Sequence, residues 1–125
     1  MITTDIAHLR LCCQRIVREK FERPAQAVAW FGAMQAQDYA GVKWAVGLRC
    51  RDTTAALIEQ EIVNKAIVRS WLMRGTLHLV ASSDLRWMLT LLGPRLIANS
   101  ARRYRQLGLD DSIFCRSGEA LATTL

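Results

Sequence analysis

Residues 30–44 read Trp-Phe-Gly-Ala-Met-Gln-Ala-Gln-Asp-Tyr-Ala-Gly-Val-Lys-Trp, and the rest of the chain is organised around this stretch. At its centre, Gln35 and Gln37 stand two positions apart. Residues at this spacing share one side of an extended chain but point to nearly opposite sides of a helix. The two amides therefore converge only if the helix that begins near Pro24 has ended by Gln35, and the polar residues and Gly41 that follow predict this. On spacing alone, two solvated glutamines at a helix end are the alternative.

Length and composition set the outer limits. The 125 residues, 51% of them hydrophobic, suit one compact domain or a small domain with part of another. Seventeen Lys and Arg against eleven Asp and Glu give a formal charge of +6, which is compatible with a polyanionic partner but does not identify one. No apolar run approaches the ~20 residues that cross a bilayer, and the amino terminus lacks a secretion signal, so we expect a cytoplasmic protein. Neither the spacing nor the surroundings of the four cysteines suit a zinc site, so we expect reduced, mostly buried thiols, no metal and no cofactor at Cys12, Cys13, Cys50 and Cys115.

Apolar residues at helical spacing predict helices before residue 65. We expect them over about residues 4–19, from Pro24 to the glutamines, over 41–49 and over about 54–64. The third is ambiguous, because Trp44 and Val46 also suit a strand. Asp52, Thr53 and Thr54 offer caps for the fourth.

The pattern changes after Lys65. Two β-branched and aromatic runs, 67–71 and 76–80, are separated by a segment that ends in Gly75, which predicts an antiparallel hairpin. Helices followed by one hairpin is the order of a winged helix, so the predicted fold is mainly α with a small β-hairpin. We expect Trp71 in the core and Arg69 either snorkelling or held by a carboxylate. Arg74 at the hairpin tip is a candidate phosphate contact or a solvated residue, and His78 is expected to be satisfied by backbone.

Residues 82–125 form the second predicted unit, after a winged-helix domain over 1–81. Ser82, Ser83 and Asp84 are expected to cap a helix that breaks at Gly93-Pro94 and resumes as far as Gly108. Its second half carries a basic cluster that could neutralise phosphates or be a solvated face, made of Arg95, Arg102, Arg103 and Arg105. A last helix is expected from Ser117, and we expect the polypeptide to stop inside a second helical or winged-helix domain.

Three separated blocks carry a family resemblance. They are the run Asp5-Ile-Ala-His-Leu-Arg10, the run from Gln35 to Ala45, and the run Ile67-Val-Arg-Ser-Trp-Leu-Met-Arg-Gly-Thr-Leu-His78. Together they resemble the amino-terminal third of the winged-helix DNA glycosylases of the AlkZ/YcaQ type. Those proteins look like tandem winged-helix modules with a β-domain, and they remove alkylated purines, including bases in interstrand crosslinks.

The resemblance implies a site and a partner. The catalytic Gln-x-Gln signature of the family falls on Gln35 and Gln37, and the partner it implies is double-stranded, damaged DNA. A purine alkylated at N7 or N3 is already a good leaving group, so amides that position water and face the developing sugar cation can suffice. The residues expected to seat the DNA backbone are Arg74, Arg69, Lys43, Arg102, Arg103 and Arg105. Because the family channel forms between modules, we expect weak, salt-sensitive DNA contact and little or no turnover by this chain.

Two other classes of function remain open at this point. A winged helix also serves transcriptional regulators that bind DNA without chemistry, and these prefer one sequence strongly. The chain could also be a protein-interaction module in which the +6 charge is incidental. The sequence does not determine the lesion or the oligomeric state.

Overall fold

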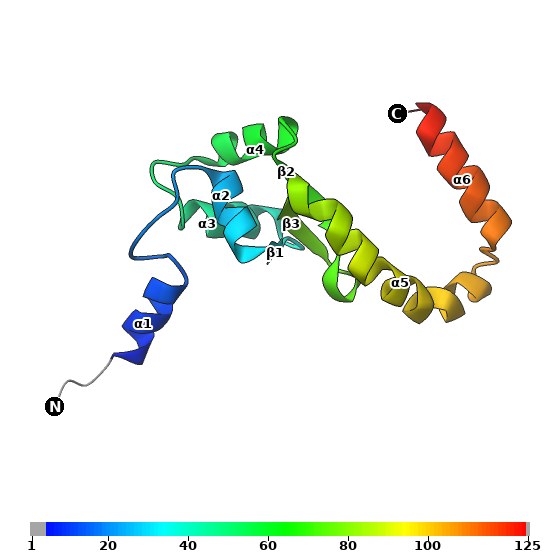
Figure 1. Ribbon diagram of the computed structural model, residues 1–125, viewed down its shortest axis with the longest axis horizontal. Helices are drawn as coiled ribbons and strands as arrows, with labels where there is room; N and C mark the ends of the chain where they lie inside the picture. The colour runs from blue at the N-terminus through cyan, green and yellow to red at the C-terminus, as the bar shows by residue number, and fades with distance from the viewer. Residues whose placement is uncertain (1–4, 125) are drawn as a thin grey trace.

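The computed structural model describes residues 5–124, and it is mainly helical with one small sheet (Figure 1). The expected fold class is confirmed. Figure 1 shows a compact body around the sheet, from which α5 runs outward to α6. In chain order the elements are α1 (Ile6–Cys13), α2 (Pro24–Phe31), β1 (Ala33–Gln35), α3 (Tyr39–Gly47), α4 (Ala55–Val63), β2 (Ile67–Trp71), the 3₁₀ turn η1 (Met73–Gly75), β3 (Leu77–Ala81), α5 (Ser82–Gln106) and α6 (Asp111–Thr124).

The sheet has three antiparallel strands in the order β1-β3-β2. The hairpin of β2 and β3 was predicted, and Gly75 with φ 68° relieves its turn as expected. The third strand was not predicted, because β1 is only three residues long and follows directly on a helix. Gly32, with φ 74°, makes that sharp change of direction possible. The order helix, strand, two helices and hairpin is winged-helix-like.

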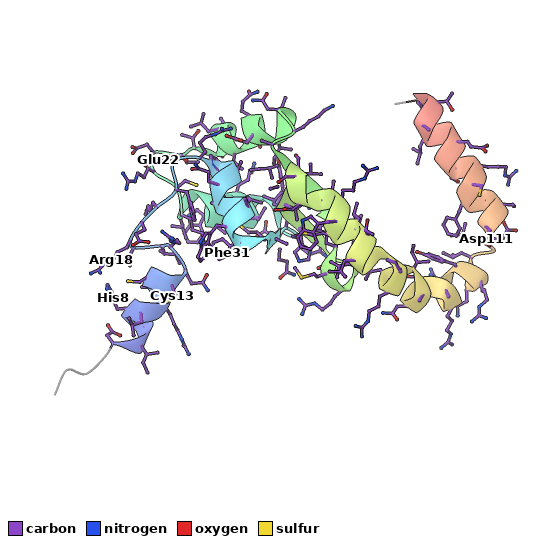
Figure 2. The ribbon with its side chains drawn as sticks, viewed as in Figure 1. His8, Cys13, Arg18, Glu22, Phe31 and Asp111 are labelled. Carbon is purple, nitrogen blue, oxygen red and sulfur yellow. The ribbon has the colours of Figure 1, made fainter. Side chains whose placement is uncertain are left out.

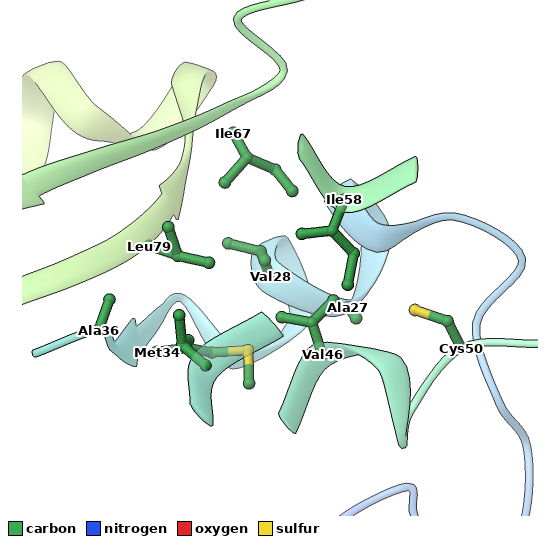
Figure 3. Packing of buried hydrophobic residues seen from close by; sticks show 10 residues of the cluster. Ala27, Val28, Met34, Ala36, Val46, Cys50, Ile58, Ile67 and Leu79 are labelled. Carbon is green, nitrogen blue, oxygen red and sulfur yellow. The ribbon is translucent and has the colours of Figure 1, made fainter. Parts of the chain in front are cut away.

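One face of the sheet builds the main core together with α2, α3 and α4 (Figure 3). Val28, Ile58 and Leu79 meet there with at most 1% of their surface exposed. Burying an aliphatic side chain of this size stabilises the fold by roughly 1.5–3 kcal/mol. The buried members of this cluster are Ala27, Val28, Met34, Ala36, Val42, Val46, Cys50, Ile58, Ile67 and Leu79.

The opposite face of the sheet is covered by the first half of α5. Met88 packs there against Leu72 and Val80, with Leu85 and Leu92 at the margin. These apolar residues recur at the spacing of one helix face, which explains why α5 lies along the sheet only over its first turns.

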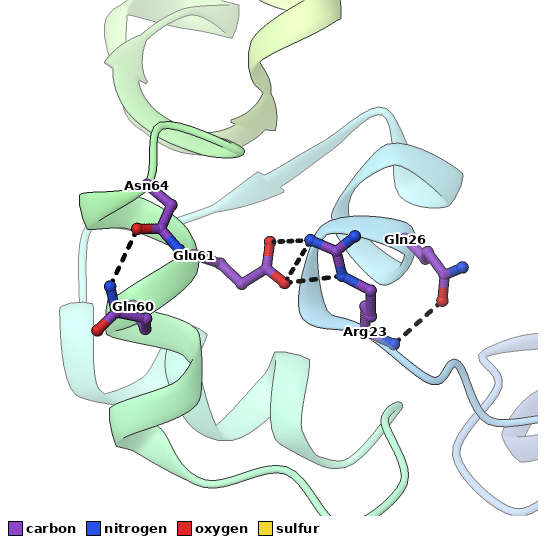
Figure 4. A network of polar contacts seen from close by, with 5 residues as sticks. All are labelled: Arg23, Gln26, Gln60, Glu61 and Asn64. Atoms are coloured by element: carbon purple, nitrogen blue, oxygen red, sulfur yellow. Dashed lines mark hydrogen bonds and ion pairs between the residues drawn. The ribbon is translucent and has the colours of Figure 1, made fainter.

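Polar contacts hold the amino-terminal end of α2 in place against α4 (Figure 4). Arg23 Nε and Nη2 donate to the carboxylate of Glu61 at 3.0 and 3.2 Å, which joins the start of α2 to α4. The Gln26 side chain accepts from the Arg23 backbone N–H at 3.0 Å and so caps α2. These bonds fix α2, and therefore the point where β1 begins.

The first helix is shorter than the pattern predicts. It ends at Cys13 instead of about residue 19, while the predicted start at residue 4 lies outside the described residues. Arg15 and Glu19 adopt left-handed φ angles of 56° and 50°, which no helix accommodates. The Arg49 guanidinium donates to the Gln14 side chain at 2.9 Å, so a tertiary contact competes with helix continuation.

The predictions for residues 82–125 need three corrections. α5 is continuous through Pro94, because one proline removes a single backbone bond and the helix is largely exposed there. No side chain caps α5, and the Ser82 hydroxyl instead donates to the Lys65 carbonyl. α6 begins at Asp111 and not at Ser117, since the Asp110 carboxylate accepts from the Ile113 N–H at 3.0 Å.

Trp71 is also misplaced by the sequence pattern. Its side chain is 59% exposed, although Ile67 on the same face of β2 is buried. The helices that cover this face contact the Ile67 end of the strand, where Ile58 of α4 packs, and leave the Trp71 end open.

The terminal helices stand apart from both clusters (Figure 2). Neither α1 nor α6 contains a buried residue, and α6 meets α5 through an edge-to-face contact of Tyr104 with Phe114 at 5.1 Å. Within residues 5–124, no helix combines the length and apolar character that spanning a membrane requires.

The cysteines should differ in reactivity. The expectation of mostly buried thiols is wrong, because within residues 5–124 only Cys50 is buried, Cys12 is half-buried, and Cys13 and Cys115 are exposed. Burial raises the pKa of the Cys50 thiol. Because the thiolate is the reactive form, we expect iodoacetamide at about pH 8 to label the exposed pair well before Cys50. Peptide mass spectrometry over a time course measures this, with urea-unfolded protein as the control. Equal labelling of all three in folded protein would contradict the placement of Cys50.

Candidate active site and nucleic-acid interface

Gln35 and Gln37 lie on non-helical backbone at the end of β1, as the sequence predicts. Gln35 is the last residue of the strand, and Gln37 follows before α3 begins at Tyr39. Both are exposed, while Ala36 between them is fully buried. The backbone therefore anchors the motif through Ala36 and leaves both amides at the surface.

At Ala36, where the pairing of β1 and β3 ends, only one of the two backbone hydrogen bonds of a regular antiparallel pair forms. The Ala36 N–H donates to the Leu77 carbonyl at 2.7 Å. The return bond of a regular antiparallel pair would run from the Leu77 N–H to the Ala36 carbonyl. Here the Leu77 N–H donates to Gln37 Oε1 at 3.1 Å instead. A side chain of the motif thus replaces a backbone rung.

This bond fixes which way the Gln37 amide faces. An N–H donor can meet only the carbonyl oxygen of the amide, so the Gln37 NH2 group points away from Leu77. Gln35 makes no side-chain hydrogen bond with any residue of 5–124, and both ends of its amide are available. The two glutamines are therefore unequal: the Gln37 oxygen accepts within the fold and leaves its NH2 group as an outward donor, whereas Gln35 can both donate and accept.

His78 lies directly across from Gln35 in the register of β1 and β3. The two form a non-hydrogen-bonded pair, in which facing Cα atoms are only ~4.5 Å apart. The His78 ring is 3% exposed, and its Nδ1 lies 2.9 Å from the Thr76 carbonyl. Because a carbonyl only accepts, Nδ1 carries the proton and Nε2 is left as an acceptor in the neutral ring. The predicted backbone partner of His78 is confirmed, but its place beside Gln35 follows only from strand pairing.

Asp38 has a structural role as the N-cap of α3. Its carboxylate accepts from the Gly41 N–H at 3.0 Å and caps α3. A Cβ on Gly41 would collide with this carboxylate, so the close approach requires glycine. This cap turns the chain from the motif into α3.

Arg69 is held by carbonyls, not by a carboxylate. Its Nε and Nη2 lie 3.1 and 2.8 Å from the backbone oxygen of Ala36, and Nη2 lies 3.5 Å from the backbone oxygen of Gln37. The Tyr39 ring is 5.2 Å from its Cζ, within cation–π distance. The carboxylate partner that the sequence offered for Arg69 is therefore wrong, whereas the residue is exposed, as the snorkelling alternative requires. Its predicted DNA contact must compete with these bonds.

Lys43 is likewise engaged. Its Nζ lies 2.5 Å from Glu59 and 4.5 Å from the centre of the Tyr39 ring. The hydrogen bond to Glu59 raises the pKa of Lys43, so the lysine is charged but already paired.

The remaining arginines lie along the hairpin tip and α5. Arg74, in the left-handed region with φ 57°, is exposed at η1 and borders an open hollow between the tip and α5. The hollow is lined by Met73, Arg74, Leu92, Arg95, Leu96 and Asn99. Arg102, Arg103 and Arg105 are exposed on the last turns of α5, which run away from the sheet (Figure 1). Arg74 and Arg95 thus line the same hollow. Arg102, Arg103 and Arg105 lie farther along α5, away from the glutamines.

Metal-ligating residues do not gather in the described part of the chain. No cluster of three His, Cys, Asp or Glu side chains with the geometry to hold an ion occurs among residues 5–124. The polar groups around the motif are two amides, the Arg69 guanidinium, the His78 imidazole and the Asp38 carboxylate that caps α3.

These features define a winged-helix-like protein with a pair of surface amides at a strand end. The model of the family described as DNA glycosylase AlkZ-like matches residues 28–123, and the chain belongs to this family. Among solved structures, the DNA glycosylase AlkZ of Streptomyces sahachiroi is similar, with a TM-score of 0.59 and 25% sequence identity. The match covers 87% of this chain and 27% of the AlkZ chain. No curated protein matches the sequence.

The inequality of the two glutamines should appear in stability. We expect Gln37→Ala to lower the free energy of unfolding by about 1 kcal/mol, because it leaves the Leu77 N–H without its acceptor. Gln35→Ala removes no intramolecular bond and should change the free energy by less than about 0.5 kcal/mol. Urea unfolding followed by circular dichroism measures both. Equal effects of the two substitutions would show that Gln37 does not complete the ladder.

Proposed function

We propose that Gln35 and Gln37 form the reaction centre of a DNA glycosylase that hydrolyses the N-glycosidic bond of N7- or N3-alkylated purines, crosslinked bases included. The observation that carries the proposal is the exposure of both amides on either side of buried Ala36. Membership of the AlkZ-like family supports it. Because the chain spans 27% of the AlkZ chain, the activity of a whole glycosylase remains part of the proposal.

The amides divide the work in this reaction. As the bond from the sugar C1′ to the purine nitrogen breaks, the electron pair leaves with the base and the sugar becomes cationic. Gln35 Oε1 accepts a hydrogen bond from the attacking water, whose oxygen then bonds to C1′ and whose proton passes to solvent. The Gln37 NH2 group, turned outward by the Leu77 bond, donates to an oxygen of the water or the sugar-phosphate. A cationic purine is a good leaving group, so no strong base is required.

In this proposal the hollow beside the hairpin tip binds the phosphate backbone of the DNA. Arg74 and Arg95 border it from different elements, and Asn99 adds an amide donor. Two guanidinium groups across an open hollow suit one or two phosphates of a duplex. Arg102, Arg103 and Arg105 extend this basic surface along α5, whereas Lys43 and Arg69 are committed to internal partners.

A sequence-reading regulator is disfavoured by α4. This helix holds the place of the recognition helix in the winged-helix order, yet its sequence carries Glu59 and Glu61 and no basic residue. Both carboxylates are paired, with Lys43 and Arg23. A helix without a basic residue of its own, whose carboxylates engage the neighbouring cations, offers little attraction to the phosphates that line a major groove.

We also propose two units, a winged-helix domain over residues 1–81 and the start of a second helical domain over 82–125, with α5 joining them. A DNA substrate places the protein in the cytoplasm in this proposal. Within residues 5–124 few cations near the motif remain unpaired, which supports weak, salt-sensitive binding and slow base release by this chain.

The chemistry is tested by release of N7-methylguanine from methylated duplex under protein excess. We expect slow release by the unaltered chain and a loss of about a hundredfold or more in Gln35→Ala, a size typical of removing one transition-state contact. Gln60→Ala on α4 is the control and should keep the activity. Equal release by the unaltered chain and Gln35→Ala would contradict the proposal, as would no release from fully bound DNA. Rapid release would instead contradict the expected low turnover.

The proposed contact of Arg74 and Arg95 with DNA phosphates is tested by the salt dependence of duplex binding. We expect Arg74→Ala and Arg95→Ala each to lower the slope of log Kd against log salt concentration by about 1, the change for one lost phosphate contact. Fluorescence anisotropy with undamaged duplex of two unrelated sequences measures this. An unchanged slope would remove the hollow from the interface, and strong preference for one sequence would favour a regulator.

A further inference from the structure

The half-made rung leaves the Ala36 carbonyl in need of a donor. Ala36 is 0% exposed, so water does not reach its oxygen. β3 does not supply the bond either, because the Leu77 N–H is given to Gln37. A buried carbonyl without a partner is costly and rare in folded proteins.

Arg69 supplies that donor from across the sheet. It lies on β2, which is separated from β1 by β3, and its guanidinium reaches the far strand. Two of its nitrogens converge on the Ala36 oxygen at 2.8 and 3.1 Å, and one of them also approaches the Gln37 oxygen at 3.5 Å. Contact with Tyr39, the first residue of α3, steadies the side chain. The guanidinium thus spans two consecutive peptide units between the glutamines and α3.

We propose that Arg69 is a positioning residue, which fixes the backbone of the Gln35-Ala36-Gln37 motif and so the orientation of both amides. This inference rests on the proposed function in one respect only, that the two amides are the reaction centre. Without Arg69, the Ala36–Gln37 peptide could move, and the hydrogen bond from the Leu77 N–H to Gln37 Oε1 could break. The outward Gln37 NH2 group would then lose its fixed direction.

The sheet keeps the Arg69 charge away from the reacting side. Arg69 pairs in register with Leu79, and Gln35 pairs with His78. Neighbouring residues of a strand point to opposite faces, so the exposed Arg69 side chain lies on the face of the sheet that also carries Leu79, while Gln35 lies on the other face. A cation beside the amides would oppose the developing sugar cation, whereas a cation behind the strand does so less.

Lysine cannot replace this arrangement. A guanidinium is planar and holds several N–H groups in a fixed fork, so Nε and Nη2 can bond at one time. An ammonium group is a single point at the end of a flexible stem. Arg69→Lys therefore keeps the charge and removes the geometry, which separates the two contributions.

Amide hydrogen exchange of the intact chain tests the proposal without requiring activity. We expect Arg69→Lys to speed exchange of the Leu77 amide by about tenfold or more, which corresponds to ~1.4 kcal/mol. The side-chain NH2 signals of Gln37 should shift toward those of a solvated glutamine in ¹H–¹⁵N spectra. Arg86→Lys on α5 is the matched control and should change neither signal.

The core amide of Val46 distinguishes a local from a global effect. In a positioning role, its exchange in Arg69→Lys stays at the level of the unaltered chain. Equal acceleration at Val46 and Leu77 would mean that Arg69 merely stabilises the whole fold, and would overturn the proposal. So would a Leu77 amide and Gln37 signals that do not respond.

DNA binding and chemistry supply the remaining contrast. Arg69→Gln should leave the salt slope of duplex binding unchanged, whereas a phosphate contact predicts a fall of about 1. If base release is measurable, Arg69→Lys should lower kcat with KM changed less than about twofold. A fall in the salt slope, or a rise in KM with kcat unchanged, would make Arg69 a DNA contact and overturn the proposal. Absence of base release with altered Leu77 exchange would refute the proposed function and leave the role of Arg69 in place.

Discussion

The incomplete rung between β1 and β3 is the constraint on which the site depends. A regular pair would bind Ala36 to Leu77 twice, and only one of these bonds forms. Gln37 takes the Leu77 N–H and Arg69 takes the Ala36 carbonyl. Because the Leu77 N–H and the Ala36 carbonyl both still find a partner, the strand can end here without loss, and the two glutamines emerge at the surface from a fixed backbone.

The surrounding fold serves this strand end. α2 is fastened to α4 by Arg23 and Glu61, and Gly32 turns the chain directly into β1. On the far side, the Asp38 cap starts α3 within one residue of Gln37. The motif is therefore held between two helices whose positions are set by the core, which is the rigid support that a reaction centre requires.

The α5 helix shows where local sequence signals fail. Gly93 and Pro94 predict a break, but the helix continues, since losing one exposed backbone bond costs less than disrupting a long helix. Trp71 shows the opposite error: its alternation predicts burial, but no helix reaches that end of β2, and the ring is 59% exposed. Both outcomes depend on which neighbours are present, and periodicity carries no information about neighbours.

The sequence by itself determined α2 and α4, the hairpin around Gly75 and the non-helical backbone at Gln35 and Gln37, because capping, periodicity and glycine act between near neighbours in the chain. It left α3 open between helix and strand, and the structure has a helix there, Tyr39–Gly47. Tertiary structure alone decided the third strand, the place of His78 beside Gln35, and the partners of Arg69 and Lys43. Each of these depends on strand pairing or on side chains more than ten positions apart. Such contacts exist only once the chain has folded, so no local pattern encodes which amide is held and which is free.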